Sequence, residues 1–344
     1  MITATIPMQM ATIETGSSTR QQNTTTATRR GAFAHVVRAI IAAGLTALLL
    51  WQSDPHAVWQ AARGADWRFI LLACALVVLD RVLMAYRWLT LLAPLDRSPR
   101  PPLGTVMRIF FVSTFVGTFL PASVGGDAVR AYGLSKEGVG GVDAVASVLM
   151  DRLLGVVSIL VVAIAGALLA RDLIDIRALF PALAVLTIAC VAALAVVFSP
   201  RAAVAVAGVL ALLPRGRETG ARLVTAIQRY ASLHLPMANV LLCSIAVQVL
   251  RVLQTYCLGL ALGLTVPLGV YFALVPIILL IVLMPITING IGTTQAGFVW
   301  LFGRAGVASA PAFALSVLFL VIAVVGNLPG AVLYLIGKGE RGKG

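Results

Sequence analysis

Charged residues inside apolar segments are the features of this sequence that most directly indicate chemistry. Arg81 and Arg251 each lie deep in a long apolar run, and Arg130 follows a glycine pair in a short polar break. A guanidinium donates several hydrogen bonds in a planar fork that suits carboxylates and phosphates. An ionisable side chain within an apolar span usually faces a cavity or a charged partner. These arginines therefore predict a binding site for an anionic group.

The sharpest motif is the break FLPASVGGD at 119–127. Gly125 and Gly126 leave backbone N–H groups uncovered. Asp127 can cap the short helix that follows, and Arg130 lies one turn further on. A helix N-terminus with an arginine nearby favours a phosphate. The alternative is a hairpin that bends only to pack against its neighbours.

A second break, MPITINGIG at 284–292, carries no charge. Its tip offers hydroxyls, amides and free backbone N–H groups, which fit a polar head group or a gate, with packing alone again the alternative. The residues of this tip are Asn289, Gly290, Ile291, Gly292, Thr293, Thr294 and Gln295.

Two further charges, Asp151 and Arg152, stand near the start of an apolar run. They either face the same site or lie at the cytoplasmic interface, and Arg87 could reach that interface by snorkelling. The predicted head-group site comprises Arg81, Gly125, Gly126, Asp127, Arg130, Asp151, Arg152, Arg251, Asn289, Gly290, Gly292, Thr293, Thr294 and Gln295.

No arrangement of residues in the sequence resembles a catalytic centre. The three histidines lie at span edges or in loops, and the four cysteines lie inside apolar blocks without a CxxC pair. A zinc site or a disulfide framework needs clustered ligands or cysteines on loops. We therefore expect no metal and no cofactor.

The composition places these residues in a membrane domain. Of the 344 residues, 60% are hydrophobic and 11% are charged, whereas a soluble domain has roughly 45–50% apolar and about 25% charged residues. The net charge of +13 fits basic loops that fix topology and touch anionic lipids, and we expect no nucleic-acid partner.

The hydropathy pattern predicts an all-α membrane protein with six full crossings and two re-entrant broken-helix hairpins. The crossings are 32–51, 67–93, 143–170, 178–198, 236–262 and 307–336, and the hairpins are 103–134 and 268–303. This layout puts most Lys and Arg residues and both termini in the cytoplasm. Residues 1–31 form a disordered tail, 32–338 the transmembrane domain with an amphipathic cytoplasmic loop at 199–235, and 339–344 a second tail.

An internal repeat relates units 67–170 and 236–336, each of which reads crossing, hairpin, crossing. DRVLMAYRW at 80–88 matches LRVLQTYCL at 250–258, and Pro121 and Gly126 match Pro285 and Gly290. The matched residues of the first pair are Arg81, Val82, Leu83 and Tyr86 with Arg251, Val252, Leu253 and Tyr256. An odd number of crossings separates the starts of the two units, so the second is inverted, as in many transporters.

Three segments of the sequence resemble one known family. They are FLPASVGGDAVRAYGL at 119–134, AVASVLMDRLLGVVSI at 144–159 and LMPITINGIGTTQAGFVWLF at 283–302. They are similar to the flippase-like family, also called the lysylphosphatidylglycerol synthase transmembrane region, over residues 35–338. Two positions differ from the family pattern: Asp151 stands where Glu is usual, and Thr294-Gln295 where a charged residue is common.

The resemblance implies a location in the bacterial cytoplasmic (inner) membrane and a lipid-handling role. In the aminoacyl-phosphatidylglycerol synthases this region precedes a cytoplasmic aminoacyltransferase domain and moves the modified lipid between leaflets. The transferase domain is not found in this sequence, so the resemblance implies only the lipid-handling part.

We therefore expect a lipid translocase rather than an enzyme. The head group of a phospholipid, or of an isoprenoid lipid or glycolipid, would move through a polar cavity between two inverted units. One alternative is a membrane-embedded transferase, or an accessory subunit of envelope lipid, glycolipid or hopanoid biosynthesis, with Asp127 and Asp151 as its only candidate acid–base residues. Another is a structural partner of envelope-biosynthesis enzymes.

Overall fold

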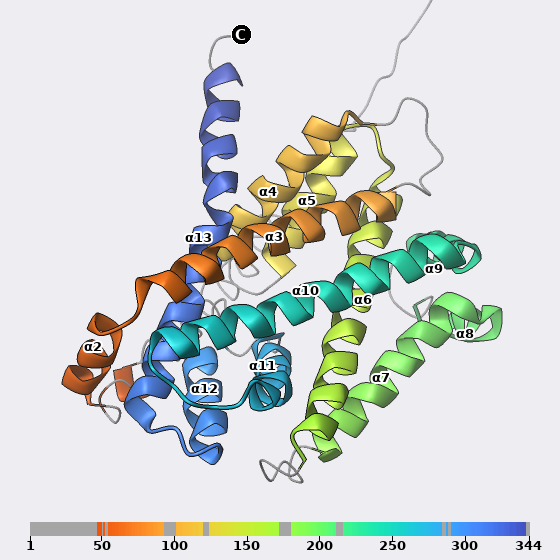
Figure 1. Cartoon of the computed structure of the whole chain (residues 1–344). Helices are drawn as coiled ribbons and strands as arrows, with labels where there is room; N and C mark the ends of the chain where they lie inside the picture. Colours follow the sequence, from red (N-terminus) through yellow and green to blue (C-terminus); the bar gives the residue numbers. More distant parts are fainter. Residues whose placement is uncertain are drawn as a thin grey trace, which may run out of the picture.

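A computed structural model of the chain describes residues 47–49, 51, 54–92, 101–119, 124–171, 180–210, 216–283, 287 and 290–341. Within these ranges every regular element is a helix, which confirms the all-α prediction (Figure 1). The elements are α2 (Pro55–Arg63), α3 (Trp67–Leu92), α4 (Leu103–Phe119), α5 (Val124–Lys136), α6 (Gly141–Leu169), α7 (Phe180–Phe198), α8 (Pro200–Leu210), α9 (Gly216–Gln228), η2 (Arg229–Ser232), α10 (His234–Ala261), α11 (Leu268–Leu283), α12 (Thr293–Arg304) and α13 (Ser309–Arg341).

Four of the described helices, α3, α6, α10 and α13, are long and apolar enough to cross a membrane. A fifth span exists if α7 and α8, which bend by 103° between them, count as one. The chain is therefore a multi-pass α-helical membrane protein. The predicted crossing at 32–51 lies almost wholly outside the described residues, as does the tail at 1–31, so the count of six crossings stays a prediction.

The two helices α3 and α10 lie side by side across the front of the view in Figure 1 and run antiparallel. At one end of the pair, the N–H of Asp66 donates to the carbonyl of Ala261 at 2.9 Å. At the other end, the Tyr230 hydroxyl donates to the carbonyl of Leu91 at 3.1 Å. This pairing brings the start of segment 80–88 next to the start of segment 250–258, where Arg251 reaches Asp80.

The interrupted stretches fold as two helical hairpins, α4–α5 and α11–α12. In the first, a Cβ on Gly126 would lie 2.9 Å from the carbonyl of Ser113 and 3.1 Å from the Cα of Gly117, so only glycine allows this close approach. Near the open end of the hairpin, Gly133 faces Ile109, which makes the two helices antiparallel. In the second hairpin, Gly297 likewise faces Ile278.

The sequence interpretation of the first break is wrong in one detail. Helix α5 begins at Val124, so Gly125, Gly126 and Asp127 lie inside its first turn rather than before it. Asp127 therefore does not cap the helix, although an acidic residue in a first turn still stabilises the positive end of the helix dipole. Within this helix, the missing side chain of Gly126 makes room for α4.

Each hairpin packs most extensively against a long helix that is distant from it in the sequence. Helix α4 lies on α13, where Gly330 faces the carbonyl of Phe111 with no room for a side chain. Helix α11 lies on α6, where Gly166 faces the carbonyl of Phe272 in the same way. Small residues at such contacts let membrane helices approach closely.

The amphipathic loop predicted at 199–235 contains α8, α9 and η2. Arg229 in η2 pairs with Asp143 at the start of α6, with 3.2 Å between Nη1 and Oδ1. At the end of the chain, α13 continues as a helix to Arg341, beyond the predicted domain end at 338.

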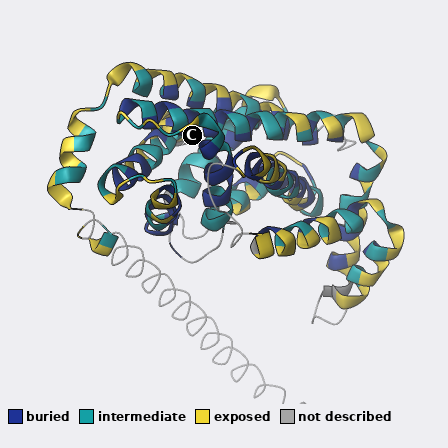
Figure 2. Cartoon of the chain, turned by 60° about the horizontal axis from the view of Figure 1, so that its bottom comes forward, coloured by how far each residue is buried: buried dark blue, intermediate teal, exposed yellow. Residues whose placement is uncertain are grey.

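Buried residues line the faces where helices meet, and the outward faces are exposed (Figure 2). The main core gathers around stacked aromatic rings such as Phe298 and Phe302, whose centroids lie 5.5 Å apart. The outward faces are themselves apolar, which suits contact with lipid chains. Examples of these exposed residues are Leu71, Val78, Val185, Ile188, Val191, Val321, Val325 and Val332.

Candidate functional site

A cavity of about 360 Å³ lies between the two hairpins and the long helices. Its wall includes Gly126 from the first hairpin and Gly290 from the second, so both hairpins reach one space. Five arginines and three aspartates line it, a formal excess of two positive charges. They are Arg81, Arg87, Arg130, Arg152, Arg251, Asp80, Asp127 and Asp151.

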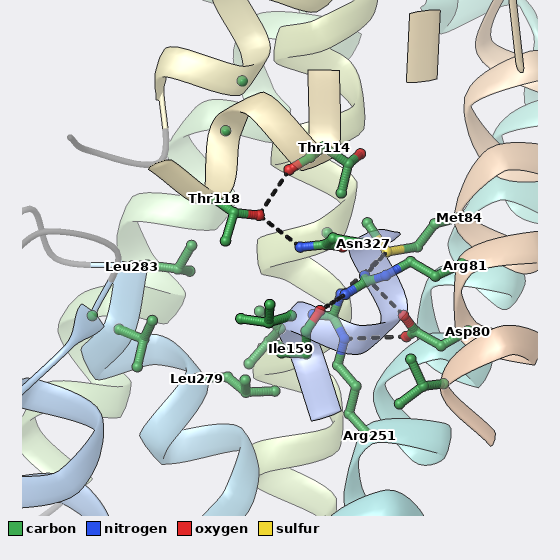
Figure 3. Close-up of a pocket in the computed structure, with 18 of the residues that line it drawn as sticks. Asp80, Arg81, Met84, Thr114, Thr118, Ile159, Arg251, Leu279, Leu283 and Asn327 are labelled. Atoms are coloured by element: carbon green, nitrogen blue, oxygen red, sulfur yellow. Dashed lines mark hydrogen bonds and ion pairs between the residues drawn. The ribbon is translucent and has the colours of Figure 1, made fainter. Parts of the chain in front are cut away.

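The first charged group, which we call the α3–α10 triad, consists of Arg81, Asp80 and Arg251 (Figure 3). One carboxylate oxygen of Asp80 accepts from Nη1 of Arg81 at 3.1 Å, and the other accepts from Nε of Arg251 at 3.2 Å. The sulfur of Met84 lies 3.4 Å and 3.2 Å from the two guanidinium groups. The antiparallel packing of α3 and α10 therefore brings the two repeat-matched arginines to one carboxylate.

The second group, the α3–α5–α6 triad, consists of Arg87, Asp151 and Arg130. Asp151 accepts from Nε of Arg87 at 2.8 Å and from Nη1 of Arg130 at 3.1 Å. All three side chains are at most 7% exposed. Removing one partner of such a buried group leaves an uncompensated charge, so this triad ties α3, α5 and α6 together.

Further contacts hold both arginines of the α3–α5–α6 triad. Arg87 donates from Nη1 to the hydroxyl of Ser244 at 3.1 Å. The Arg130 guanidinium lies 5.2 Å from the ring centroid of Trp88 and 4.8 Å from that of Phe110. Its Nε also lies 3.4 Å from the hydroxyl of Ser113. Arg130 is therefore fixed by aromatic and polar contacts on several sides.

The remaining charged pair joins Arg152 on α6 to Asp127 on α5. The Nε of Arg152 lies 2.6 Å from Oδ2 of Asp127, and the two side chains are 40% and 15% exposed. The pair lines the same cavity but is the most exposed of its ion pairs.

The second hairpin tip contributes Thr287, Gly290 and Thr294 to the cavity wall. Its hydroxyls are used mainly within the tip itself, since Thr293 and Thr294 both donate to the carbonyl of Gly290, at 3.0 and 2.7 Å. Gly290 has a φ of +75°, which favours glycine. The N–H of Gly292 donates to the Gln295 side chain at 2.6 Å, which fixes the start of α12.

Several polar atoms that are buried among the cavity-lining residues have no hydrogen-bond partner in the described part of the chain. They are Nε of Arg81, Oε1 of Gln248, Nε2 of Gln254 and Oδ1 of Asn327. Buried polar groups are normally satisfied, and exceptions gather where a ligand or water binds. The cavity therefore has both donors and acceptors available for a polar group.

The structure brings nine of the fourteen predicted residues to the cavity wall: Arg81, Gly126, Asp127, Arg130, Asp151, Arg152, Arg251, Gly290 and Thr294. Gly125, Gly292, Thr293 and Gln295 are absent from this wall, and Asn289 lies outside the described residues.

The predicted set omitted polar residues that α10 presents to the cavity, among them Gln248 and Gln254, and it omitted Asp80. A signal for the α10 residues exists in the sequence. Ser244, Gln248 and Arg251 recur at spacings of four and three, which puts them on one face of a helix. A polar stripe on an otherwise apolar span indicates an inward-facing side.

Among the described residues, no group of three or more His, Cys, Asp or Glu side chains could hold a metal ion. The cavity lining offers charge pairing and hydrogen bonding by arginine, aspartate and amide groups.

Comparison with known families supports the sequence resemblance. The family described as "Lysylphosphatidylglycerol synthase TM region" matches residues 35–330, which include all of the cavity-lining residues. A comparison with the curated proteins found no match. The chain belongs to the lysylphosphatidylglycerol synthase transmembrane-region family.

Proposed function

We propose that this protein is a lipid translocase that moves a lipid with an anionic head group between the leaflets of a bilayer. The observation that carries the proposal is the cavity lined by five arginines and three aspartates within a bundle of apolar helices. A buried excess of positive charge is costly unless an anion compensates it. A phosphate-bearing head group supplies that compensation.

The size of the cavity and the apolar outer surface of the bundle fit a lipid whose head group enters the cavity while its acyl chains stay outside. A volume of about 360 Å³ lies at the lower end of the range for small-ligand sites, roughly 300–1,000 Å³, and suits a head group rather than a whole lipid. The apolar outward faces leave the acyl chains in the hydrocarbon phase. The head group would then exchange sides without carrying its charge through lipid.

We further propose that the two repeat units are inverted relative to one another. The antiparallel α3–α10 pair and the reciprocal packing of α4 on α13 and α11 on α6 support this arrangement. The hairpins α4–α5 and α11–α12 would be re-entrant from opposite faces, in a bacterial inner-membrane protein of six crossings with both termini in the cytoplasm.

The carboxylates that a membrane transferase would use are engaged by arginines. Asp127 pairs with Arg152, and Asp151 pairs with Arg87 and Arg130. Both carboxylates thus already accept from guanidinium groups within the protein, which leaves them less free to contact a substrate. These contacts favour the translocase.

The test is lipid exchange in vesicles that contain the purified full chain. Labelled phosphatidylglycerol is placed in both leaflets, and a membrane-impermeant quencher reports how fast the inner pool reaches the outer leaflet. We expect exchange well above protein-free vesicles, and a loss of at least about tenfold in Arg251→Gln, as when one charge-assisted hydrogen bond is removed.

The matched control is Arg222→Gln. Arg222 pairs with Glu218 on the exposed face of α9, and the two side chains are 68% and 79% exposed. This variant should exchange lipid at the wild-type rate. Wild-type vesicles that are no faster than protein-free ones, for any anionic lipid, would reject the proposed function.

A further inference from the structure

The two triads of the cavity have the same composition, two arginines and one aspartate, but their arginines are held very differently. In the α3–α5–α6 triad, Arg130 has a carboxylate and a hydroxyl as acceptors and lies near two aromatic rings. Its side chain is 7% exposed. This arginine has little capacity left for a ligand.

The α3–α10 triad is under-satisfied by comparison. Besides Asp80, Arg81 and Arg251 contact the sulfur of Met84, which is a weak acceptor. Arg81 also donates to the carbonyl of Ala323 at 3.5 Å. The Nε of Arg81 has no acceptor within the described residues. The side chains of Arg81 and Arg251 are 13% and 23% exposed, against 6% and 7% for the arginines of the other triad.

The bridge made by Asp80 has the form of a bound anion. Each of its carboxylate oxygens pairs with the guanidinium of one arginine, at 3.1 Å for Arg81 and 3.2 Å for Arg251. The two non-bridging oxygens of a phosphodiester carry one negative charge in a similar fork and can make the same bridge. Asp80 therefore occupies the positions that a head-group phosphate would take between Arg81 and Arg251.

The sequence repeat supports the idea that Asp80 is an addition to a symmetric arginine pair. Arg81 and Arg251 are matched positions, whereas the residue before Arg251 is Leu250. The partner that the two arginines share therefore comes from one unit only. Gln254, the counterpart of Met84 in the repeat, lines the same cavity with an unpartnered side-chain nitrogen.

We propose that Asp80 is a displaceable internal counter-ion, and that a monoanionic phosphodiester head group binds Arg81 and Arg251 in its place. This inference rests on the proposed function, because it assumes that the cavity receives a lipid head group. Asp80 neutralises part of the arginine charge while the site holds no lipid. It also lowers the affinity for the phosphodiester by competing for the same donors, which allows the head group to leave.

Binding to the full chain in detergent micelles tests this. The probe is dioctanoyl phosphatidylglycerol, and dioctanoylglycerol, which lacks the phosphate, reports binding of the acyl chains alone. We expect Asp80→Asn to bind the phosphatidylglycerol at least about tenfold more tightly than wild type, the effect of removing one competing charge-assisted contact. Binding of dioctanoylglycerol should be unchanged.

A second pair of variants decides the matter even if Asp80→Asn alone fails to fold. Arg251→Gln leaves Arg81 neutralised by Asp80 and should lose most phosphatidylglycerol binding. Asp80→Asn with Arg251→Gln leaves Arg81 free and has the same net charge at the triad as wild type. We expect this double variant to recover binding relative to Arg251→Gln.

Failure of this inference differs from failure of the proposed function. A double variant that binds phosphatidylglycerol no more tightly than Arg251→Gln overturns the counter-ion role, whatever the exchange assay shows. Tighter binding by the Asp80 variants, together with vesicles that exchange no lipid, would keep the counter-ion site and reject translocation.

Discussion

The guanidinium of Arg87 lies 2.8 Å from the carboxylate of Asp151, and this contact joins α3 to α6 in the interior of a membrane domain. Arg130 reaches the same carboxylate from α5, so one aspartate holds three helices. The cavity thus has one charged group that is built into the fold and another that is loosely held. We therefore expect substitutions in the α3–α5–α6 triad to change stability, and substitutions in the α3–α10 triad to change lipid binding.

Asp151→Asn should destabilise the protein strongly. The substitution leaves Arg87 and Arg130 without their shared counter-ion in a buried site, which costs about 3–5 kcal/mol. The loss appears as a lower apparent melting temperature of the purified protein. Glu218→Gln, which breaks an exposed pair on α9, should cost no more than about 1 kcal/mol, and equal losses in the two variants would contradict the structural role of the triad.

Arg130→Lys should lower stability although it keeps the positive charge. A lysine lacks the planar fork that reaches Asp151 and Ser113 from fixed directions, and it cannot stack on the rings of Trp88 and Phe110 as a guanidinium does. Thermal unfolding of the variant measures the effect. Arg251→Lys serves as the comparison, because we expect it to change lipid exchange more than stability. A larger loss of stability in Arg251→Lys than in Arg130→Lys would contradict the different roles of the two triads.

Gly126→Ala should disturb the first hairpin. The new methyl group would lie 2.9 Å from the carbonyl of Ser113 and 3.1 Å from the Cα of Gly117, so the backbones of α4 and α5 must separate. Overpacking of this kind costs about 1–3 kcal/mol, which a thermal unfolding curve detects. Gly104→Ala is the matched control on α4, since nothing lies within 4 Å of its added Cβ, and it should leave the melting temperature unchanged or slightly raised.

Labelling of single cysteines from each side of the membrane tests the re-entrant hairpins. In a variant that lacks the four native cysteines, Gly104→Cys and Glu137→Cys flank the first hairpin, and Thr265→Cys and Ala308→Cys flank the second. We expect both members of each pair to react from one side, the first pair from the cytoplasm and the second from outside. Two members of one pair that react from opposite sides would make that hairpin a full crossing.

The sequence predicted the helical class, the hairpins and much of the cavity because these depend on local patterns. Prolines and glycines interrupt the apolar runs near Pro121 and Pro285, and the arginines within apolar spans must face inward. The sequence also marked Arg81 and Arg251 as matched charges within apolar spans, and the structure shows both at the carboxylate of Asp80.

The parts that the sequence did not predict depend on contacts between distant helices. Asp80 is shared with Arg251 because α3 packs on α10, and no local pattern states that pairing. The close approach of α4 to Gly126 in the first turn of α5 is likewise a contact between two helices. Thr293 looked available for a ligand, yet its hydroxyl donates within its own tip, since the backbone turn at Gly290 presents a carbonyl to it.

The reciprocal packing of the hairpins has a consequence for biogenesis. Helix α4 leaves the ribosome early, but α13, against which it packs most extensively, is synthesised last. The first hairpin is therefore made long before Gly330 of α13 can pack against Phe111 of α4. Docking of α13 onto this hairpin would then complete the cavity wall, to which α13 contributes Phe319, Ile322 and Asn327.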